Sequence, residues 1–327
     1  MTPDEARMAE AVALGAAVRR RTPPNPWVGC LIVPAGGGEA FEGATEAPGG
    51  RHAEAVALDL AGAAAHGATA YVSLEPCAHQ GRTPPCADAL VAAGVARVVV
   101  ATEDPDGHVD GRGIARMRAG GIRVEVGVGR PGAEEVLAPY LKHRRSGRPW
   151  VVLKLAATMD GRTAAPDGTS RWITGPAARA DAHALRAESD AVAVGAGTVR
   201  ADDPRLTVRD AEGPDPLRVV LGRVPPGARV TPALEHTGAL EDLLDDLGRR
   251  GVLQLLVEGG PRVAHSFHSA RLVDRYVLYL APALLGGDDG RPVLAGAGAP
   301  SIAGLWRGRL AGVRELDGDL RVDVLAR

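Results

Sequence analysis

Two kinds of hydrophobic pattern alternate along the first half of the chain. Some stretches carry apolar residues three or four positions apart, which is typical of amphipathic helices, and others are short apolar runs, which are typical of buried strands. The first kind predicts helices over residues 4–20, 52–65, 84–94 and 113–119. The second kind predicts strands over residues 28–33, 40–43, 70–74, 97–101 and 122–126. Such alternation indicates an α/β sheet with helices on both faces.

A second α/β pattern follows a basic, polar stretch. We predict strands over residues 150–156, 191–194, 217–221, 252–257, 275–280, 310–314 and 320–325, and helices over 176–187, 241–250 and 261–270. The intervening segment Lys142–Pro149 is rich in charge, and we expect it to be a solvated linker. Because 327 residues suit two domains of about 150 residues each, we predict a first domain over 1–146 and a second over 147–327.

The charge balance argues against a nucleic-acid partner. The chain has 38 Lys and Arg residues against 40 Asp and Glu residues, and only 3% of its residues are aromatic. Nucleic-acid binding needs a basic surface, and single-stranded nucleic acid also needs stacking aromatic side chains. A small phosphorylated ligand needs only a few local positive groups, so the composition is compatible with one.

Cysteine use and hydropathy indicate a cytoplasmic protein. The chain has only three cysteines, Cys30, Cys77 and Cys86, and such a small, odd number does not indicate a disulfide framework. No apolar run reaches the length of a membrane span, and residues 1–20 lack the apolar core of a signal peptide. Cys30 falls within a predicted strand, where we expect it to be a core residue.

Three residues in the first half have the pattern of a catalytic zinc site. His52 opens a predicted helix, Cys77 follows the strand over 70–74, and Cys86 comes nine residues after Cys77, near the start of the helix predicted over 84–94. Three ligands of this kind leave the fourth tetrahedral position of zinc to water, which distinguishes a catalytic from a structural site. Glu54, two residues after His52, is placed to relay protons without binding the metal. This order of residues is the signature of zinc-dependent base deaminases.

The spacing departs from the usual Pro-Cys-x-x-Cys ending of that signature. Eight residues separate Cys77 from Cys86, and we expect this insert, Ala78–Pro85, to form a loop long enough to hold substrate. Two other interpretations stay open. A nucleic-acid deaminase is disfavoured by the charge balance, and a structural zinc domain needs a fourth protein ligand, for which no residue lies close in sequence.

Features of the second half suggest a nucleotide cofactor. Predicted strands end at Gly195-Ala-Gly197 and at Gly259-Gly260-Pro261, where backbone N–H groups at a helix start can approach a phosphate. Neither is a complete dinucleotide fingerprint, and each also fits a plain strand-to-helix connection. Lys154 lies inside an apolar strand, where burying its charge is unfavourable unless it has an ionic partner or a catalytic role. A strand end that faces solvent would also explain it.

Longer segments resemble one known family. The segments Pro24–Cys30, His52–Ala55 and Leu74–Cys86 resemble the deaminase half of the bifunctional riboflavin-biosynthesis deaminase/reductase, whose long inter-cysteine loop is similar. Leu153–Thr163, Ser170–Thr174 and Ala201–Arg209 resemble its reductase half. The resemblance implies an α/β fold class, with an N-terminal cytidine-deaminase-like three-layer domain and a C-terminal dihydrofolate-reductase-like α/β domain.

The resemblance also implies two reactions and their site residues. The first is zinc-dependent hydrolytic deamination of 2,5-diamino-6-(5-phosphoribosylamino)pyrimidin-4-one, and the second is NADPH reduction of its ribosyl group to ribityl. Lys154 is implied as a catalytic residue of the reductase. Residues implied to contact a substrate are Asn25, His79, Arg82, Ser170, Arg186, Leu206, Arg209 and Glu258. Residues implied to face the cofactor are Ala156, Trp172, Thr198, Asp202, Gly260, Pro261, Arg262, Val263, Ala264, His265 and Ser266. The family also implies a homo-oligomer.

The sequence departs from the family pattern at three places. Thr45 stands where a histidine is common, Gly50-Arg51 replaces a Glu-Pro pair, and Gly222-Arg223 replaces an acidic-polar pair. We hypothesise that Arg223 binds the 2′-phosphate of NADPH. An alternative to the bifunctional interpretation is an active deaminase joined to a non-functional reductase half.

Overall fold

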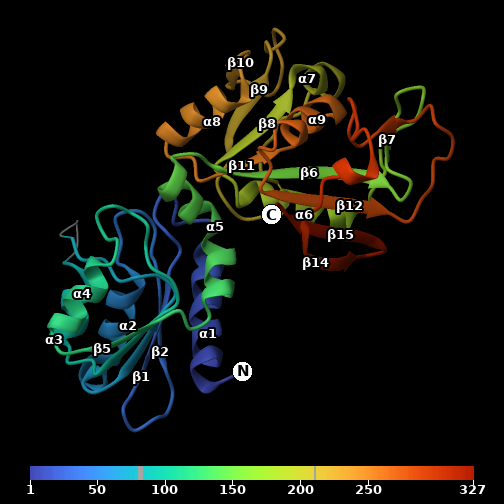
Figure 1. Cartoon of the computed structure of the whole chain (residues 1–327). Helices are drawn as coiled ribbons and strands as arrows, with labels where there is room; N and C mark the ends of the chain where they lie inside the picture. Colours follow the sequence, from blue (N-terminus) through green and yellow to red (C-terminus); the bar gives the residue numbers. More distant parts are fainter. Residues whose placement is uncertain (80–83, 210) are drawn as a thin grey trace. The chain divides into compact units, whose positions relative to one another are not determined.

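The structure is a computed structural model that describes residues 1–79, 84–209 and 211–327. The chain forms two compact units, Met1–Gly147 and Arg148–Arg327 (Figure 1). Each unit contains its own sheet and its own core.

The first unit is built on a five-stranded sheet in the order β2-β1-β3-β4-β5. The strands are β1 (Gly29–Val33), β2 (Phe41–Ala44), β3 (Thr69–Val72), β4 (Arg97–Val100) and β5 (Arg123–Val126). The strand β1 is antiparallel to both of its neighbours, whereas β3, β4 and β5 are parallel. The helices are α1 (Pro3–Val18), α2 (Ala53–Ala61), α3 (Cys86–Ala92), α4 (Arg112–Ala119) and α5 (Arg130–Ser146), with a short 3-10 turn, η1 (Gly62–Ala65).

Two glycines let helices approach this sheet from opposite faces. A Cβ atom at Gly29 would lie 1.9 Å from the carbonyl oxygen of Ala11 in α1, and one at Gly43 would lie 2.1 Å from the carbonyl oxygen of Ala53 in α2. Because Gly43 pairs with Cys30, it faces away from the side that Gly29 faces. The helices α1 and α5 pack on one face and α2 lies on the other, so the predicted three-layer arrangement is confirmed. Cys30 is fully buried in β1, as expected of a core residue.

The basic stretch that we expected to be a solvated linker is mostly helical, so that prediction is wrong. Helix α5 runs to Ser146 and ends at Gly147, which has the positive φ of 70° that glycine adopts readily. Leu137, Tyr140 and Leu141 bury one side of α5, and Trp27 donates its indole N–H to the carbonyl of Val136. The buried face therefore holds the helix together, while the basic residues 142–145 at its end are half-buried or exposed.

The second unit is built on an eight-stranded sheet in the order β10-β9-β8-β11-β6-β12-β15-β14. Its strands are β6 (Trp150–Thr158), β8 (Ala191–Gly195), β9 (Leu217–Leu221), β10 (Leu234–His236), β11 (Gln254–Val257), β12 (Arg275–Ala281), β14 (Arg309–Leu316) and β15 (Asp319–Leu325). A separate pair joins β7 (Arg162–Ala164) and β13 (Arg291–Pro292). The six strands from β10 to β12 in this order are parallel, and β15 and β14 add an antiparallel edge.

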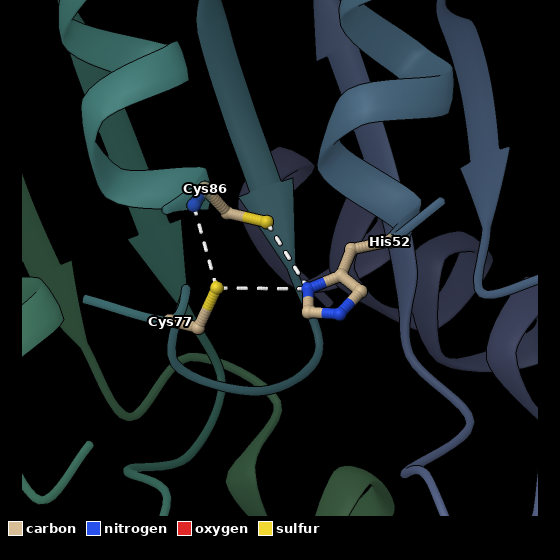
Figure 2. A group of neighbouring side chains, drawn as sticks. All are labelled: His52, Cys77 and Cys86. Atoms are coloured by element: carbon tan, nitrogen blue, oxygen red, sulfur yellow. Dashed lines mark hydrogen bonds between the residues drawn. The ribbon is translucent and has the colours of Figure 1, made fainter. Parts of the chain in front are cut away.

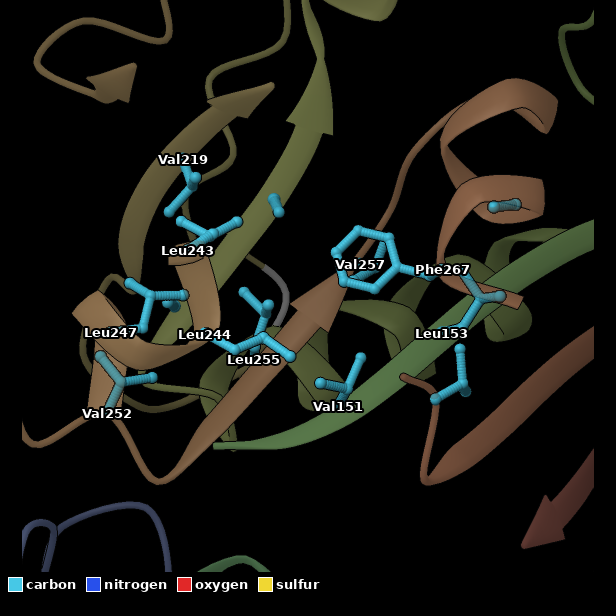
Figure 3. Packing of buried hydrophobic residues seen from close by; sticks show 14 of the residues in the cluster. Val151, Leu153, Val219, Leu243, Leu244, Leu247, Val252, Leu255, Val257 and Phe267 are labelled. Carbon is cyan, nitrogen blue, oxygen red and sulfur yellow. The ribbon is translucent and has the colours of Figure 1, made fainter. Parts of the chain in front are cut away.

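Helices cover both faces of the larger sheet. They are α6 (Pro176–Ala187), α7 (Ala196–Asp202), α8 (Leu240–Arg249) and α9 (Pro261–Ser269), and a 3-10 turn, η2, spans Ile302–Gly304. Figure 3 shows the core on one face, where Leu243 and Leu247 of α8 and Phe267 of α9 pack against Val151 and Leu255. Full burial of each such side chain stabilises the unit by about 1.5–3 kcal/mol. A second core lies under α6 and α7 on the other face.

Most of the predicted elements are confirmed to within a few residues. The chief elements that the apolar pattern did not predict are α5, α7, β7, β10 and β13. In the part of the chain that the structure describes, no helix has the length and apolar character needed to span a bilayer.

Candidate zinc and reductase sites

The structure brings the three predicted metal ligands together. His52 is the N-cap residue of α2, Cys77 follows β3, and Cys86 is the first residue of α3. The Nδ1 atom of His52 lies 3.6 Å from the Sγ atom of Cys77 and 3.3 Å from that of Cys86. Figure 2 shows the two sulfur atoms and this nitrogen facing a common point.

These distances fit a zinc ion. Tetrahedral ligands with Zn–S bonds of about 2.3 Å and Zn–N bonds of about 2.0 Å lie about 3.5 Å apart. All three ligand atoms lie within 4.8 Å of one another, and no fourth His, Cys, Asp or Glu joins the group among the described residues. The arrangement therefore suits a catalytic site, in which the remaining position takes water, better than a structural one.

The electrostatics of the site favour a thiolate at Cys77. Hydrogen bonding from Cys86, and then from His52, outweighs burial and lowers the pKa of Cys77 to about 4. The backbone N–H of Cys86 also donates to the Cys77 sulfur at 3.4 Å. A deprotonated sulfur is the form that binds metal.

Glu54 lies in the first turn of α2, and its side chain is buried beside the ligands. Burial first, and then the negative charge of Cys77, raise the pKa of the Glu54 carboxyl. A carboxyl with a raised pKa holds a proton more readily than an ordinary carboxyl, as a proton relay must. Its place beside the ligand group is the one expected of a proton relay.

The other residues expected at the deaminase site differ in how far they are buried. Asn25 is half-buried just before β1, His79 is exposed two residues after Cys77, and Arg82 lies outside the described residues. Thr45 is buried, and its hydroxyl accepts the backbone N–H of Val28 at 3.1 Å. Thr45 therefore joins the end of β2 to the start of β1.

In the second unit, Lys154 and Glu258 are brought side by side by strand register. Leu153 of β6 pairs with Val257 of β11, so the next residues, Lys154 and Glu258, are neighbours at the carboxyl end of β11. Burial first, and then the cation of Arg186, lower the pKa of Lys154, while Glu258 opposes them. The Nζ atom of Lys154 also lies 5.8 Å from the centre of the Tyr279 ring.

Arg186 of α6 makes a two-point ion pair with Glu258. Its Nε and Nη2 atoms donate to the two carboxylate oxygens at 2.6 Å and 2.8 Å, and its Nη1 atom donates to the carbonyl of Thr207 at 3.0 Å. Burial alone would raise the pKa of Glu258, but the Arg186 charge outweighs it and lowers that pKa. Arg186 is implied by the resemblance to contact the substrate, and in this geometry three of its donors already have protein acceptors.

Arg209 and Leu206 follow α7 and lie near this pair. The Nη2 atom of Arg209 lies 3.3 Å from Nε2 of His183, and the Nη1 atom of Arg186 lies 3.5 Å from Nδ1 of the same ring. His183 thus links the two arginines. Leu206 is buried and has a φ of 56°, a left-handed conformation that is uncommon for a side chain of this size.

Ser170 and Trp172 line a cavity of about 190 Å³ beside β6 and β7. The Trp172 ring is 70% exposed and is covered by the guanidinium of Arg179 at 4.4 Å. Asp202 at the end of α7 accepts from Nη2 of Arg171 at 3.1 Å. Ala156 is half-buried in β6. Their exposure leaves Ser170, Trp172 and Asp202 accessible to a ligand.

The remaining residues expected at the cofactor lie at neighbouring strand ends. Thr198 is in α7 after β8, and Gly260, Pro261, Arg262, Val263, Ala264, His265 and Ser266 form the N-cap and first turns of α9 after β11. A Cβ atom at Gly260 would lie 3.5 Å from the hydroxyl oxygen of Thr198. A Cβ atom at Gly195 would lie 2.9 Å from Val263. The close contact at Gly195 requires glycine, and the backbone N–H groups at the start of α9 are a donor set that fits a phosphate of NADPH.

Arg223 follows β9, and its side chain is 83% exposed. Its Nη1 atom donates to the Glu235 carboxylate at 3.0 Å. An exposed ion pair of this kind is weak, so it leaves Arg223 available to another anion.

Sequence reasoning missed two buried polar residues beside these sites. Glu75 accepts backbone N–H groups from four residues between positions 104 and 114. His183 lies one helical turn before Arg186 and contacts both arginines of the reductase site. For Glu75, the available signal was a carboxylate directly after a buried strand. For His183, it was the position on the face of α6 that carries Arg186.

Comparison with known proteins assigns each unit to a family. Residues 1–102 match the cytidine and deoxycytidylate deaminase zinc-binding region, and residues 149–322 match the RibD C-terminal domain. The riboflavin biosynthesis protein RibD of Escherichia coli is 42% identical over 328 residues, which cover 87% of this chain and 89% of that protein. RibD of Mycobacterium tuberculosis is 42% identical over 341 residues, covering 99% and 97%.

Solved structures agree over the full length. Acinetobacter baumannii RibD superposes with a TM-score of 0.91 at 38% identity, covering 99% of both chains. A diaminohydroxyphosphoribosylaminopyrimidine deaminase/5-amino-6-(5-phosphoribosylamino)uracil reductase from Thermotoga maritima superposes with a TM-score of 0.87 at 31% identity, again over 99% of both. This chain therefore belongs to the RibD family of bifunctional riboflavin-biosynthesis enzymes, in which a zinc-binding deaminase domain is joined to an NADPH-dependent reductase domain.

Proposed function

We propose that the chain deaminates 2,5-diamino-6-(5-phosphoribosylamino)pyrimidin-4-one and then reduces the resulting aminouracil nucleotide. The observation that carries this proposal is the geometry of His52, Cys77 and Cys86 in a chain whose second unit matches the RibD C-terminal domain. The Thermotoga relative is described by the same pair of activities, which supports the choice of substrate.

In the first reaction, water replaces the 2-amino group of the pyrimidine, and ammonia leaves. His52, Cys77 and Cys86 would hold a zinc ion, and that ion would supply a water molecule whose pKa is lowered toward about 7. Glu54 would accept a proton from the attacking water and deliver it to the departing nitrogen. Its buried position beside the ligands keeps this proton from exchanging with bulk solvent. Asn25, His79 and Arg82 contact the substrate and orient it.

In the second reaction, the ribosyl ring opens and its C1′ atom is reduced. NADPH supplies the hydride. Lys154 carries a proton beside the ribosyl group, and its low pKa makes it a better acid than an ordinary lysine. Glu258 holds the substrate hydroxyls. Arg186 binds both oxygens of Glu258 and thereby fixes its orientation.

The other residues bind and position the two reductase ligands. Ser170, Leu206 and Arg209 contact the phosphorylated substrate. Residues that contact NADPH are Ala156, Trp172, Thr198, Asp202, Gly260, Pro261, Arg262, Val263, Ala264, His265 and Ser266. The start of α9 supplies backbone donors for a cofactor phosphate. We further propose that the enzyme acts in the cytoplasm as a homo-oligomer and binds no nucleic acid.

One coupled assay tests the whole proposal. The diaminopyrimidine nucleotide is supplied to the purified chain with NADPH, and ammonia release and NADPH oxidation are followed with and without a zinc chelator. We expect chelation to stop ammonia release and, with it, NADPH oxidation. Adding the deaminated nucleotide to the chelated enzyme should restore NADPH oxidation alone.

The two halves fail in distinguishable ways. Ammonia release without NADPH oxidation, even from added deaminated nucleotide, would favour a non-functional reductase half. Ammonia release that persists after the zinc has been removed would contradict the assignment of the metal ligands.

A further inference from the structure

Tyr279 is a large buried side chain of the second unit that lies next to Lys154 and that the proposed reactions do not use. It belongs to β12, and only 1% of its surface is exposed. Strand register pairs Tyr279 with Ala156 and Val277 with Lys154, so these side chains point to the same face of the sheet. The helix α6, which carries Arg186, covers that face. Tyr279 therefore lies beneath the same helix as Arg186 of the reductase site.

The Tyr279 ring lies at cation–π distance from Lys154. The Nζ atom of Lys154 is 5.8 Å from the ring centre, and the guanidinium carbon of Arg321 is 6.0 Å from the same centre. A cation within about 6 Å of an aromatic ring is attracted by the negative charge of the ring face. Lys154 is also close enough for Glu258 to attract its ammonium group and for Arg186 to repel it. The ring thus adds an attraction whose direction differs from that of the ionic groups.

The hydroxyl group of Tyr279 is bonded to Asp181 of α6. It donates to Oδ2 of Asp181 at 2.6 Å, and the same oxygen accepts from Nη1 of Arg321 at 2.5 Å. The other oxygen of Asp181 accepts from Nη2 of Arg314 at 3.2 Å. Arg321 in turn donates from Nε and Nη2 to the two oxygens of Asp323 at 2.9 and 3.0 Å. The hydroxyl bond fixes the place of the ring, and these ion pairs fix the acceptor.

This network of charges is largely buried. The side chains of Arg321 and Asp323 are each 6% exposed, and that of Asp181 is 15% exposed. Removing charges from water costs about as much as their mutual attraction returns, so stability alone is a weak reason for burying them. Fixing a tyrosine ring beside a catalytic lysine gives the network a second role.

We propose that Tyr279 is a positioning residue of the reductase, whose ring, held by Asp181, directs the ammonium group of Lys154 toward the ribosyl group. The inference rests on the proposed function, in which Lys154 carries a proton beside that group, and adds the residue that orients the lysine. A lysine ammonium group lies at the end of a long, flexible stem, so its position must be set by its neighbours. A displacement of about 1 Å in a reacting group can lower the rate about a hundredfold.

The test compares two substitutions in the full-length enzyme supplied with NADPH and the deaminated nucleotide. Tyr279→Leu removes the ring, and kcat should fall about ten- to a hundredfold because Lys154 is no longer directed. Both KM values should stay unchanged, since a ring that is 1% exposed offers no surface to either ligand. Tyr279→Phe keeps the ring and loses only the bond to Asp181. Its kcat should fall about threefold, as expected for the loss of one hydrogen bond.

Tyr276→Leu is the matched control. Tyr276 lies in the same strand and is 5% exposed, but it points to the opposite face, where its hydroxyl lies 2.8 Å from Nδ1 of His268. Tyr276→Leu and Tyr279→Leu each remove a buried ring, so urea unfolding should show a similar loss of stability in the two variants. Only Tyr279→Leu should lower kcat of the reductase. Zinc-dependent ammonia release reports on the first unit and should be unchanged in both variants.

Several outcomes would overturn the inference while leaving the proposed function intact. An unchanged kcat in Tyr279→Leu would show that the ring does not direct Lys154. An equal fall of kcat in Tyr276→Leu would show that the loss follows from lower stability. A rise in KM at constant kcat would place Tyr279 in ligand binding instead. If Tyr279→Leu fails to fold, Tyr279→Phe decides the question, and an unchanged kcat in that variant would refute the proposal. Absence of NADPH oxidation by the unmodified enzyme supplied with the deaminated nucleotide would count against the proposed function itself.

Discussion

Removal of the Arg186 guanidinium tests how the reductase site holds a buried carboxylate. The side chains of Arg186 and Glu258 are only 12% and 10% exposed, and two hydrogen bonds join them. Arg186→Met keeps most of the side-chain volume but removes the cation that binds both oxygens of Glu258 and leaves Lys154 and His183 beside it. Breaking a buried pair in this way costs about 3–5 kcal/mol of unfolding free energy.

The lowered pKa of Glu258 determines how the stability loss in Arg186→Met changes with pH. Glu258 has a lowered pKa in the folded chain, so the pair contributes stability above the unfolded value of 4.5 and loses it as pH falls through the lower folded value. In Arg186→Met, burial dominates and raises that pKa. We therefore expect the variant to be least stable relative to the unmodified enzyme at neutral and alkaline pH, and the difference to shrink in acid.

Urea unfolding followed by hydrogen exchange can assign the loss to one unit. With a slope of about 2 kcal/mol per molar urea, a loss of this size lowers the midpoint by about 2 M. Peptides from residues 148–327 should show this shift, and peptides from 1–147 serve as the internal control. The double variant Arg186→Met/Glu258→Gln removes the unpaired charge and should recover much of the loss. A double variant as unstable as Arg186→Met alone would refute the electrostatic reasoning.

Three further predictions give separate readouts. Glu54→Gln should keep its zinc, measured by metal analysis, while ammonia release falls about 10²- to 10⁴-fold as expected for loss of a proton relay; undiminished release would exclude that role. Because the pKa of Lys154 is lowered, the reductase rate should fall on the alkaline side below pH 10.5, and Lys154→Met should abolish that limb along with most of the activity. Arg223→Ala should raise KM for NADPH far more than for NADH, whereas Glu235→Gln, which frees Arg223, should not; equal rises for both cofactors would remove Arg223 from 2′-phosphate binding.

The apolar pattern predicted the elements of both sheets well, and α5 shows where it failed. Gly132 and Pro139 lie within this helix and disfavour it on local grounds, whereas Pro131 stands in its first turn, where proline is tolerated. Pro139 removes the N–H that would bond the carbonyl four residues earlier. The helix forms because Leu137 and Tyr140 are buried in tertiary contacts, which a local pattern does not contain.

The zinc ligands could be predicted because their chemistry restricts both residue type and spacing. The reductase arginines could not be assigned with the same success, since an arginine in a sequence does not reveal its partner. Arg186 donates to Glu258, which is 72 positions away in sequence, and only the packing of α6 against β11 brings the two together. The role of Thr45 could not be predicted either, because its hydroxyl accepts a hydrogen bond from the backbone N–H of Val28 within the core.

Both sites lie where parallel strands end, and this explains how residues so distant in sequence meet. In the first unit, Glu75 and Cys77 follow β3, and Asp104 follows the parallel neighbour β4. In the second unit, Thr198 and Glu258 follow the parallel neighbours β8 and β11. Strands that run in the same direction place all their following turns at one edge, where helix N-termini also present free N–H groups. Substitutions at the opposite edge, such as His66→Ala, should therefore leave ammonia release unaffected, whereas a substitution at the carboxyl edge, such as Cys77→Ala, should abolish it.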